Sequence, residues 1–277
     1  MHTMFRRYKP FFRTGAMNLL AYKFQMIMWL VISALQVACI FFLWDGVYKS
    51  STTEVINGYT FEQMIVYMAF VNVATFVVLG GDTMWTILRE IKNGTIAMSF
   101  VKPISYRVRF IFSTLGDTTM LICLFGIPCF TILYVVFALI GFITVPAWWM
   151  LLLQILLFAV SALLAMLLWD CVNYICGILC FYTTAGWGLS NLKDTIIRFL
   201  SGSLIPLAFF PAWAEKLLLY SPFAGLSQNP VLILLGRYSL TQSLQFIGLS
   251  FAWWIVLEGL AWLLFNKASK KVTVQGG

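Results

Sequence analysis

The sequence predicts an all-α integral membrane protein in which residues 1–277 form a single transmembrane domain. Hydrophobic residues make up 61% of the chain and charged residues only 10%, and the mean hydropathy is +0.91. A soluble domain carries about a quarter charged residues. This chain cannot cover itself with polar surface, so we expect the bilayer to be its solvent.

Six transmembrane helices are expected, because a helix needs about 20 apolar residues to cross the hydrocarbon. Five apolar runs satisfy this condition, the second one when Phe61–Gln63 is added to it: Phe24–Trp44, Met64–Leu79, Phe110–Ile140, Trp148–Leu168 and Phe246–Phe265. The sixth span, fifth in chain order, is expected within Val172–Leu189, with the alternative that it slides toward Leu200.

Basic residues predict the orientation. Thirteen of the eighteen Lys and Arg residues fall before the first span, between the second and third spans, or after the last span. Cytoplasmic loops carry such an excess. We therefore expect both termini and the loop 82–109 in the cytoplasm of a multi-pass protein of the bacterial cytoplasmic membrane. The same placement argues against nucleic acid as the reason for the net charge of +8.

The first 23 residues mix aromatic and aliphatic residues with Arg and Lys, and Pro10 and Gly15 interrupt them. This composition favours a helix lying in the inner membrane interface. The alternative is an ordinary flanking segment that only sets orientation.

The loop 82–109 reads as two short helical pieces. Asp82 or Thr83 can cap a helix, apolar residues recur at helical spacing from Met84 to Ile91, and Gly94 can end the helix in the left-handed conformation. A second piece, Thr95–Val101, ends before Pro103. The simpler alternative is a solvated amphipathic hairpin.

The segment 201–236 contains Gly202 and four of the eight Pro residues: Pro206, Pro211, Pro222 and Pro230. No uninterrupted spanning helix fits it. Short apolar helices broken by Pro and Gly are tolerated at membrane depth when they pack on protein or line a cavity. We expect re-entrant helices on the outer face.

Two carboxylates fall inside expected spans, Asp117 in the third and Glu258 in the last. Charged residues there are costly and often functional, so both could face a polar route or a partner helix. Alternatively, Asp117 is hydrated near the inner interface and Glu258 hydrogen-bonds to a Ser or Thr. Asp170 is expected near the inner turn after the fourth span.

Catalytic chemistry is not indicated. The chain has no G-x-x-x-x-G-K-[ST] phosphate-binding loop, its single His is His2, and its six Cys residues lie in apolar runs. We therefore expect no catalytic, metal-binding or cofactor-binding residues in this chain.

The stretch "EIKNGTIAMSFVKPISY" resembles the cytoplasmic loop of permease subunits of type 2 ATP-binding cassette (ABC) exporters, in the daunorubicin-permease-like branch. The segments "FLSGSLIPLAFFPAW" and "YSPFAGLSQNPVLILLG" resemble the outer region of that branch, and "NLLAYKFQ" its approach to the first span. The Lys102-Pro103 pair stands where Arg-Pro is commoner, and Lys lacks the guanidinium fork of Arg.

The resemblance implies six spans, an N-terminal interfacial helix, a coupling helix between spans two and three, and re-entrant helices before span six. It also implies a second permease chain, the same or homologous, and two copies of a separate ABC ATPase that binds ATP and Mg²⁺. Its residue assignments form two sets. The ATPase-coupling set is Arg89, Glu90, Lys92, Gly94, Lys102 and Pro103, and the outer-gate set is Gly202, Pro206, Pro211, Pro222 and Pro230.

The function expected from this resemblance is export of an amphipathic or hydrophobic compound, as in multidrug or antibiotic resistance. Substrate identity and the choice between homodimer and heterodimer stay open. The alternative is a passive channel or a non-transporting membrane scaffold whose basic loop only anchors it. A membrane-embedded enzyme is disfavoured because catalytic groups are not clustered.

Overall fold

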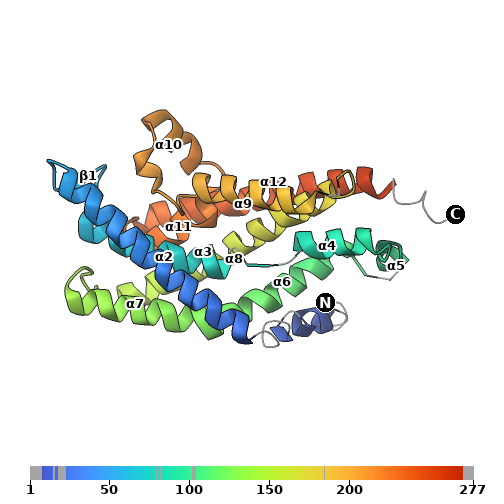
Figure 1. Cartoon of the computed structure of the whole chain (residues 1–277), viewed down its shortest axis with the longest axis horizontal. Coiled ribbons are helices and arrows are strands. Elements are labelled where there is room, and N and C mark those ends of the chain that lie inside the picture. Colours follow the sequence, from blue (N-terminus) through green and yellow to red (C-terminus); the bar gives the residue numbers. More distant parts are fainter. Residues whose placement is uncertain are drawn as a thin grey trace.

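The computed structural model describes residues 8–14, 16–17, 23–78, 80–81, 83–101, 104–183 and 185–270. Long helices run lengthwise through one elongated bundle (Figure 1). They are α2 (Lys23–Ser50), α3 (Phe61–Val78), α8 (Trp148–Leu179), α12 (Leu240–Ala268) and a composite helix. The composite joins α6 (Tyr106–Leu121), the π-helical turn η1 (Ile122–Gly126) and α7 (Ile127–Ile140).

Five helical runs in the described part of the chain are long and apolar enough to cross a membrane. Each overlaps one of the five apolar runs predicted from the sequence. The last four contain the predicted run, and the first, Val31–Ser50, covers only the later part of Phe24–Trp44. Large apolar side chains on their outer faces are exposed, for example Phe42 at 70%, Leu139 at 82% and Leu152 at 64%. Such a surface suits lipid rather than water.

The structure is mostly helical, as predicted, but one end of the bundle also carries a small β-hairpin that the sequence analysis did not predict. Strand β1 (Val55–Ile56) pairs antiparallel with β2 (Tyr59–Thr60). Asn57 and Gly58 between them both have positive φ angles, the conformation that a tight two-residue hairpin turn requires. Arg237, just before α12, lies over the Tyr59 ring at 5.4 Å, so α12 begins at this hairpin end.

The opposite end carries two short helices, α4 (Thr83–Lys92) and α5 (Ile96–Val101). We call residues 83–101 the elbow. Ile87 and Ile96 of the elbow share one buried cluster with Tyr174 of α8 and Ala268 of α12. Helices α8 and α12 therefore end at the elbow, and the helix formed by residues 8–14 lies beside α6 toward the same end of the bundle (Figure 1).

The prediction of a separate span within Val172–Leu189 is wrong. Val172–Leu179 is the last part of α8, which continues because nothing before Cys180 breaks the helix. The next helix, α9 (Gly186–Leu200), matches the alternative that the span slides toward Leu200. Its 15 residues measure about 22 Å at 1.5 Å per residue, less than the roughly 30 Å of hydrocarbon.

The segment after α9 forms short helices at the hairpin end. They are η2 (Leu207–Phe209), α10 (Ala212–Leu219), η3 (Ala224–Leu226) and α11 (Gln228–Leu234). Every residue of α11 is buried, and Val231 and Leu232 share a core with Tyr67 and Phe70 of α3. Since α8 ends at the elbow and α12 begins at the hairpin, α9 and these short helices lead the chain back along the bundle.

The described residues 8–14 are helical and pack on α6. The Tyr8 ring stacks on Phe112 with centroids 5.3 Å apart, and the Tyr8 hydroxyl accepts a hydrogen bond from the Ser105 backbone N–H at 2.8 Å. A Cβ on Gly116 would lie 2.1 Å from the Phe12 carbonyl oxygen. Glycine at position 116 therefore permits this close approach.

Candidate functional site

The elbow has the two-piece form that the sequence predicted. Helix α4 ends at Lys92, α5 starts at Ile96, and Gly94 between them has φ +68°. A residue with a Cβ pays about 1–2 kcal/mol for this left-handed conformation, so glycine fixes the change of direction.

The apolar face of α4 packs against the last turns of α8. Met84 and Leu88 form a buried cluster with Cys176 and Cys180. Gly177 lets Ile87 approach so closely that an added Cβ would lie 2.5 Å from Ile87 Cδ1. The elbow is thus seated on the end of α8 rather than hanging free as a solvated hairpin.

Glu90 connects the elbow to α6. Its side chain accepts hydrogen bonds from Arg109 Nη2 at 2.8 Å and from the Tyr106 hydroxyl at 2.9 Å. Arg109 also donates to Ser99 Oγ of α5 at 3.3 Å. The carboxylate of Glu90 is 16% exposed, so it faces α6 rather than the outer side of α4 where the sequence placed it.

The outer side of the elbow presents Arg89, Lys92, Gly94 and Met98, all exposed. Met98 is 71% exposed, so this side carries a large apolar side chain as well as two cations. Arg89 and Lys92 lie three residues apart, within one helical turn of α4. Lys102 and Pro103, the remaining residues of the predicted coupling set, lie outside the described residues.

An ionic triad ties three long helices together beside the elbow. Arg107 of α6 donates through Nη1 to Asp170 Oδ2 of α8 at 2.5 Å, and through Nη2 to Glu258 Oε1 of α12 at 2.5 Å. Arg107 Nε also lies 3.0 Å from Glu258 Oε2, which makes the Glu258 contact bidentate. The three side chains are 15%, 1% and 22% exposed, respectively.

Asp170 is the most connected member of this triad. Its Oδ1 accepts hydrogen bonds from Thr83 Oγ1 at 2.6 Å and from Thr114 Oγ1 at 2.7 Å. Thr83 is the first residue of α4 and Thr114 belongs to α6. A single buried carboxylate therefore joins α8 to the elbow, to α6 and, through Arg107, to α12.

Two of the three carboxylates in or near the expected spans differ from the prediction. The prediction that Asp170 lies near a turn is wrong, because α8 runs on to Leu179. Glu258 pairs with Arg107, not with a Ser or Thr. Asp117 is half-buried on α6, ten residues beyond Arg107, and does not belong to the triad.

The predicted outer-gate residues lie at the hairpin end and shape its short helices. Gly202 has φ +78° and its carbonyl accepts a 2.7 Å hydrogen bond from the Tyr67 hydroxyl. Pro206 and Pro211 immediately precede η2 and α10, Pro222 lies in the turn after α10, and Pro230 is the third residue of α11. Helix α11 thus begins two residues earlier than a proline at the first helical position would predict.

Tyr238 fixes the approach to α12 at the same end. Burial raises the pKa of Tyr238 well above its ordinary value, so the hydroxyl stays protonated and donates to Asn229 Oδ1 at 3.3 Å. Gln228 Oε1 in turn accepts from the Leu207 N–H at 2.8 Å. Side-chain hydrogen bonds therefore hold the short helices in register.

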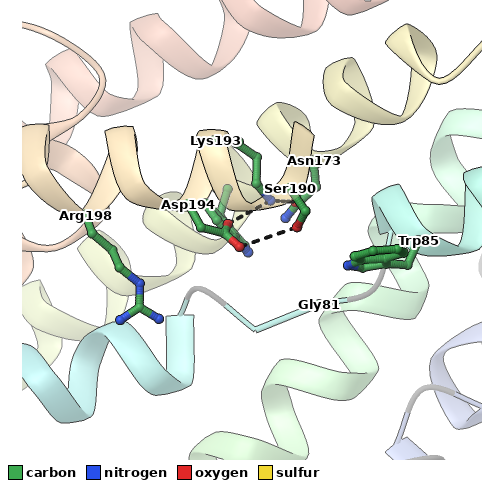
Figure 2. Close-up of a pocket in the computed structure, with 8 residues that line it drawn as sticks. Gly81, Trp85, Asn173, Ser190, Lys193, Asp194 and Arg198 are labelled. Atoms are coloured by element: carbon green, nitrogen blue, oxygen red, sulfur yellow. Dashed lines mark hydrogen bonds and ion pairs between the residues drawn. The ribbon is translucent and has the colours of Figure 1, made fainter. Parts of the chain in front are cut away.

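A polar pocket of about 110 Å³ opens between the start of α4, α8 and α9. Figure 2 shows Lys193, Asp194, Ser190 and Asn173 gathered on one side, Trp85 across from them, and Arg198 further along α9. Lys193 donates to Asn173 Oδ1 and lies 3.1 Å from Asp194 Oδ1. Its ammonium also sits 4.2 Å from the centre of the Trp169 ring.

Sequence reasoning missed this pocket and the role of Arg107. Arg107 and Arg109 were counted only as loop charges, although each pairs with a carboxylate of another helix. The sequence did contain a signal for this pairing. Arg107 lies at the start of one expected span, and Asp170 and Glu258 lie toward those ends of two other spans that are expected on the same side of the membrane. Counting from Trp148 and Leu240, Asp170 and Glu258 lie about 33 and 27 Å along their helices.

This architecture is that of a multi-pass membrane protein with a short helical elbow inserted between two spans. The chain belongs to the ABC-2 family of transporter proteins, whose family model matches residues 34–276. It is accordingly an ABC-2 type permease, a transporter component that works with an ATPase partner. No curated protein and no solved structure shows significant similarity to the chain.

Proposed function

We propose that this chain is the membrane-spanning permease subunit of an ATP-driven exporter of the daunorubicin-permease-like branch. A separate ATPase subunit, which holds ATP and Mg²⁺, docks on the elbow and drives an amphipathic or hydrophobic substrate out of the cell. Two permease chains and two ATPase copies form the transporter in this proposal.

The hydrogen-bond network around Asp170 is the observation that carries this proposal. A docking partner can shift a permease only if it binds two conformations with different affinity. Thr83 at the start of the elbow shares Asp170 with Thr114 and Arg107. A displacement of the elbow therefore changes contacts of α6, α8 and α12 together.

The docking surface proposed here is the outer side of the elbow, with Arg89, Lys92 and Met98. Glu90 is assigned the internal role of attaching the elbow to α6, because its carboxylate is occupied by Arg109 and Tyr106. Two exposed cations beside an exposed Met suit an ATPase surface with acidic and apolar groups.

Co-expression with the cognate ATPase tests this assignment. The double variant Arg89→Glu/Lys92→Glu should lose copurification of the ATPase and substrate-stimulated ATP hydrolysis while the permease still folds. Lys216→Glu on α10, at the hairpin end, is the matched control and should keep both. Unchanged assembly and hydrolysis in the double variant would remove the docking assignment.

The proposed orientation places the elbow and both termini in the cytoplasm, with α9 and segment 201–239 completing a sixth crossing. Labelling tests it directly. In a cysteine-free background, a cysteine at Ala97 of the elbow should resist a membrane-impermeant maleimide in intact cells. A cysteine at Thr52 beside the hairpin should react. The reverse pattern would overturn the orientation.

An apolar groove supports the proposed class of substrate. A space of about 790 Å³ lies between α3, the composite α6–α7 helix and α8. Its lining includes Phe70, Phe130, Phe158 and Met166. This volume falls within the roughly 300–1,000 Å³ of small-molecule sites, and its lining suits a hydrophobic molecule.

A further inference from the structure

Helix α9 is amphipathic in a way that lipid alone does not explain. Asn191, Asp194, Thr195 and Arg198 recur at spacings of three and four, which places them on one face. Asn191, Thr195 and Arg198 are exposed, and the Asp194 side chain is 39% exposed. The adjacent exposed stripe is apolar, with Leu192, Ile196 and Phe199 at 60%, 44% and 45%.

Within the described part of the chain, Arg198 has no counter-ion. Lys193 is balanced by Asp194, but the Arg198 guanidinium makes no ion pair or side-chain hydrogen bond within the described residues. It lies about 18 Å along α9 from Gly186. On the six-crossing arrangement of the proposed function, that position is at membrane depth, where an uncompensated Arg is costly and marks a functional site.

The pocket beside Arg198 is built from polar groups that are themselves buried. Asn173 and Ser190 are 3% and 6% exposed, and the Lys193 side chain is 8% exposed. The indole N–H of Trp169, a lining residue only 4% exposed, has no hydrogen-bond partner within the described residues. The pocket thus has a wall of buried polar side chains held in place by the surrounding helices.

We propose that this pocket binds the anionic head group of an amphiphile. Lys193 and Arg198 outweigh Asp194 by one positive charge. The pocket volume of about 110 Å³ suits a compact phosphate or carboxylate rather than a whole molecule. The apolar stripe of Leu192, Ile196 and Phe199 adjoins the polar stripe on α9 and receives the chain. This inference rests on the proposed function and narrows its substrate class to anionic amphiphiles.

Binding to the full-length permease alone tests the proposal. The protein is placed in phosphatidylcholine nanodiscs, and dodecyl phosphate, dodecyltrimethylammonium and inorganic phosphate are titrated by calorimetry, with empty nanodiscs subtracted. Dodecyl phosphate should bind at least about tenfold more tightly than the ammonium compound, as one charge-assisted hydrogen bond implies. If inorganic phosphate binds as tightly as dodecyl phosphate, the pocket is an anion site, but its ligand is a free anion rather than the head group of an amphiphile.

Arg198→Gln should weaken dodecyl phosphate about tenfold or more and leave the ammonium compound unchanged. Because Arg198 has no ion pair in the described residues, this change spares the fold better than Lys193→Gln, which also removes the contact with Asn173. Lys216→Gln on α10 is the matched control and should bind like the unaltered protein.

Equal binding of the phosphate and ammonium compounds, or no effect of Arg198→Gln, would overturn the head-group site. So would an Arg198→Gln protein that changes only in oligomeric state, because the counter-ion would then come from a second copy of the chain. The ATPase is absent from this assay. A negative result in this binding assay therefore does not affect the test of ATPase docking on the elbow. A negative result in the docking test likewise does not affect this binding assay.

Discussion

Arg107→Gln is the sharpest perturbation of the network beside the elbow. The change removes the only cation that the described residues place between Asp170 and Glu258. Glutamine keeps a polar side chain of similar length but carries no charge. Two carboxylates are then left facing each other at the meeting point of α6, α8 and α12.

The cost follows from burial. Removing one partner of a buried ion pair costs about 3–5 kcal/mol, because the remaining charge has no compensation. Asp170 is 1% exposed but keeps hydroxyl donors from Thr83 and Thr114, which places Arg107→Gln near the lower figure of about 3 kcal/mol. Asp170→Asn leaves Arg107 paired with Glu258 and should cost only about 1–2 kcal/mol.

The double variant Arg107→Gln/Asp170→Asn measures the pair itself. The free energy of unfolding lost in the double variant should be smaller than the sum of the two single losses by about 1–2 kcal/mol. The reason is that the effects of substituting two residues in contact are not additive. Unfolding is followed by circular dichroism during titration of mixed micelles with sodium dodecyl sulfate.

Lys49→Gln is the control for this cycle. It breaks the pair with Asp45, in which the Lys49 side chain is 76% exposed, and such pairs contribute about 0–1 kcal/mol. Additive losses within about 0.5 kcal/mol for Arg107→Gln and Asp170→Asn would show that the two residues are not coupled, and the role given to Asp170 would fail.

Three further changes test separate parts of the fold. Gly116→Ala should detach the helix at residues 8–14, because its Cβ would lie 2.1 Å from the Phe12 carbonyl oxygen. Hydrogen exchange of the backbone amides in this helix should then rise. The control is Gly126→Ala, whose Cβ has an ordinary 3.5 Å contact and which should leave that exchange unchanged. Gly94→Ala meets no atom within 4 Å but has φ +68°, so it should cost about 1–2 kcal/mol in the same titration; no loss would mean that the elbow relaxes freely. Tyr67→Phe removes the donor to the buried Gly202 carbonyl and should cost about 1–3 kcal/mol, and a neutral result would show that water replaces the hydroxyl.

The elbow could be predicted from sequence because its signals are local. Thr83 starts the first helix, Gly94 supplies the positive φ, and Met84, Ile87 and Leu88 mark the buried face. Each signal acts within a few residues of the position it specifies. The five apolar runs were predictable for a similar reason, since membrane thickness sets the length of a span.

Features that depend on tertiary contacts were not predictable in this way. The apolar pattern of Val172–Leu179 is the same whether it opens a new span or ends α8. The difference between these two outcomes comes from a tertiary contact, the close packing of Ile87 of the elbow against Gly177. Glu90 likewise lies between two basic residues in the sequence, and its carboxylate turns inward because of Tyr106 and Arg109, sixteen and nineteen positions later.

The ionic triad of Arg107, Asp170 and Glu258 raises the question of why the chain keeps charges where lipid disfavours them. A buried ion pair is seldom a source of net stability, because desolvation offsets the attraction. Apolar residues at positions 107, 170 and 258 would hold three helices together as well. They would not make the contacts of α12 depend on the hydroxyl of Thr83 at the start of the elbow. In the proposed function, this network, in which one carboxylate joins four elements, is made in one conformation and broken in another, and the ATPase selects between the two.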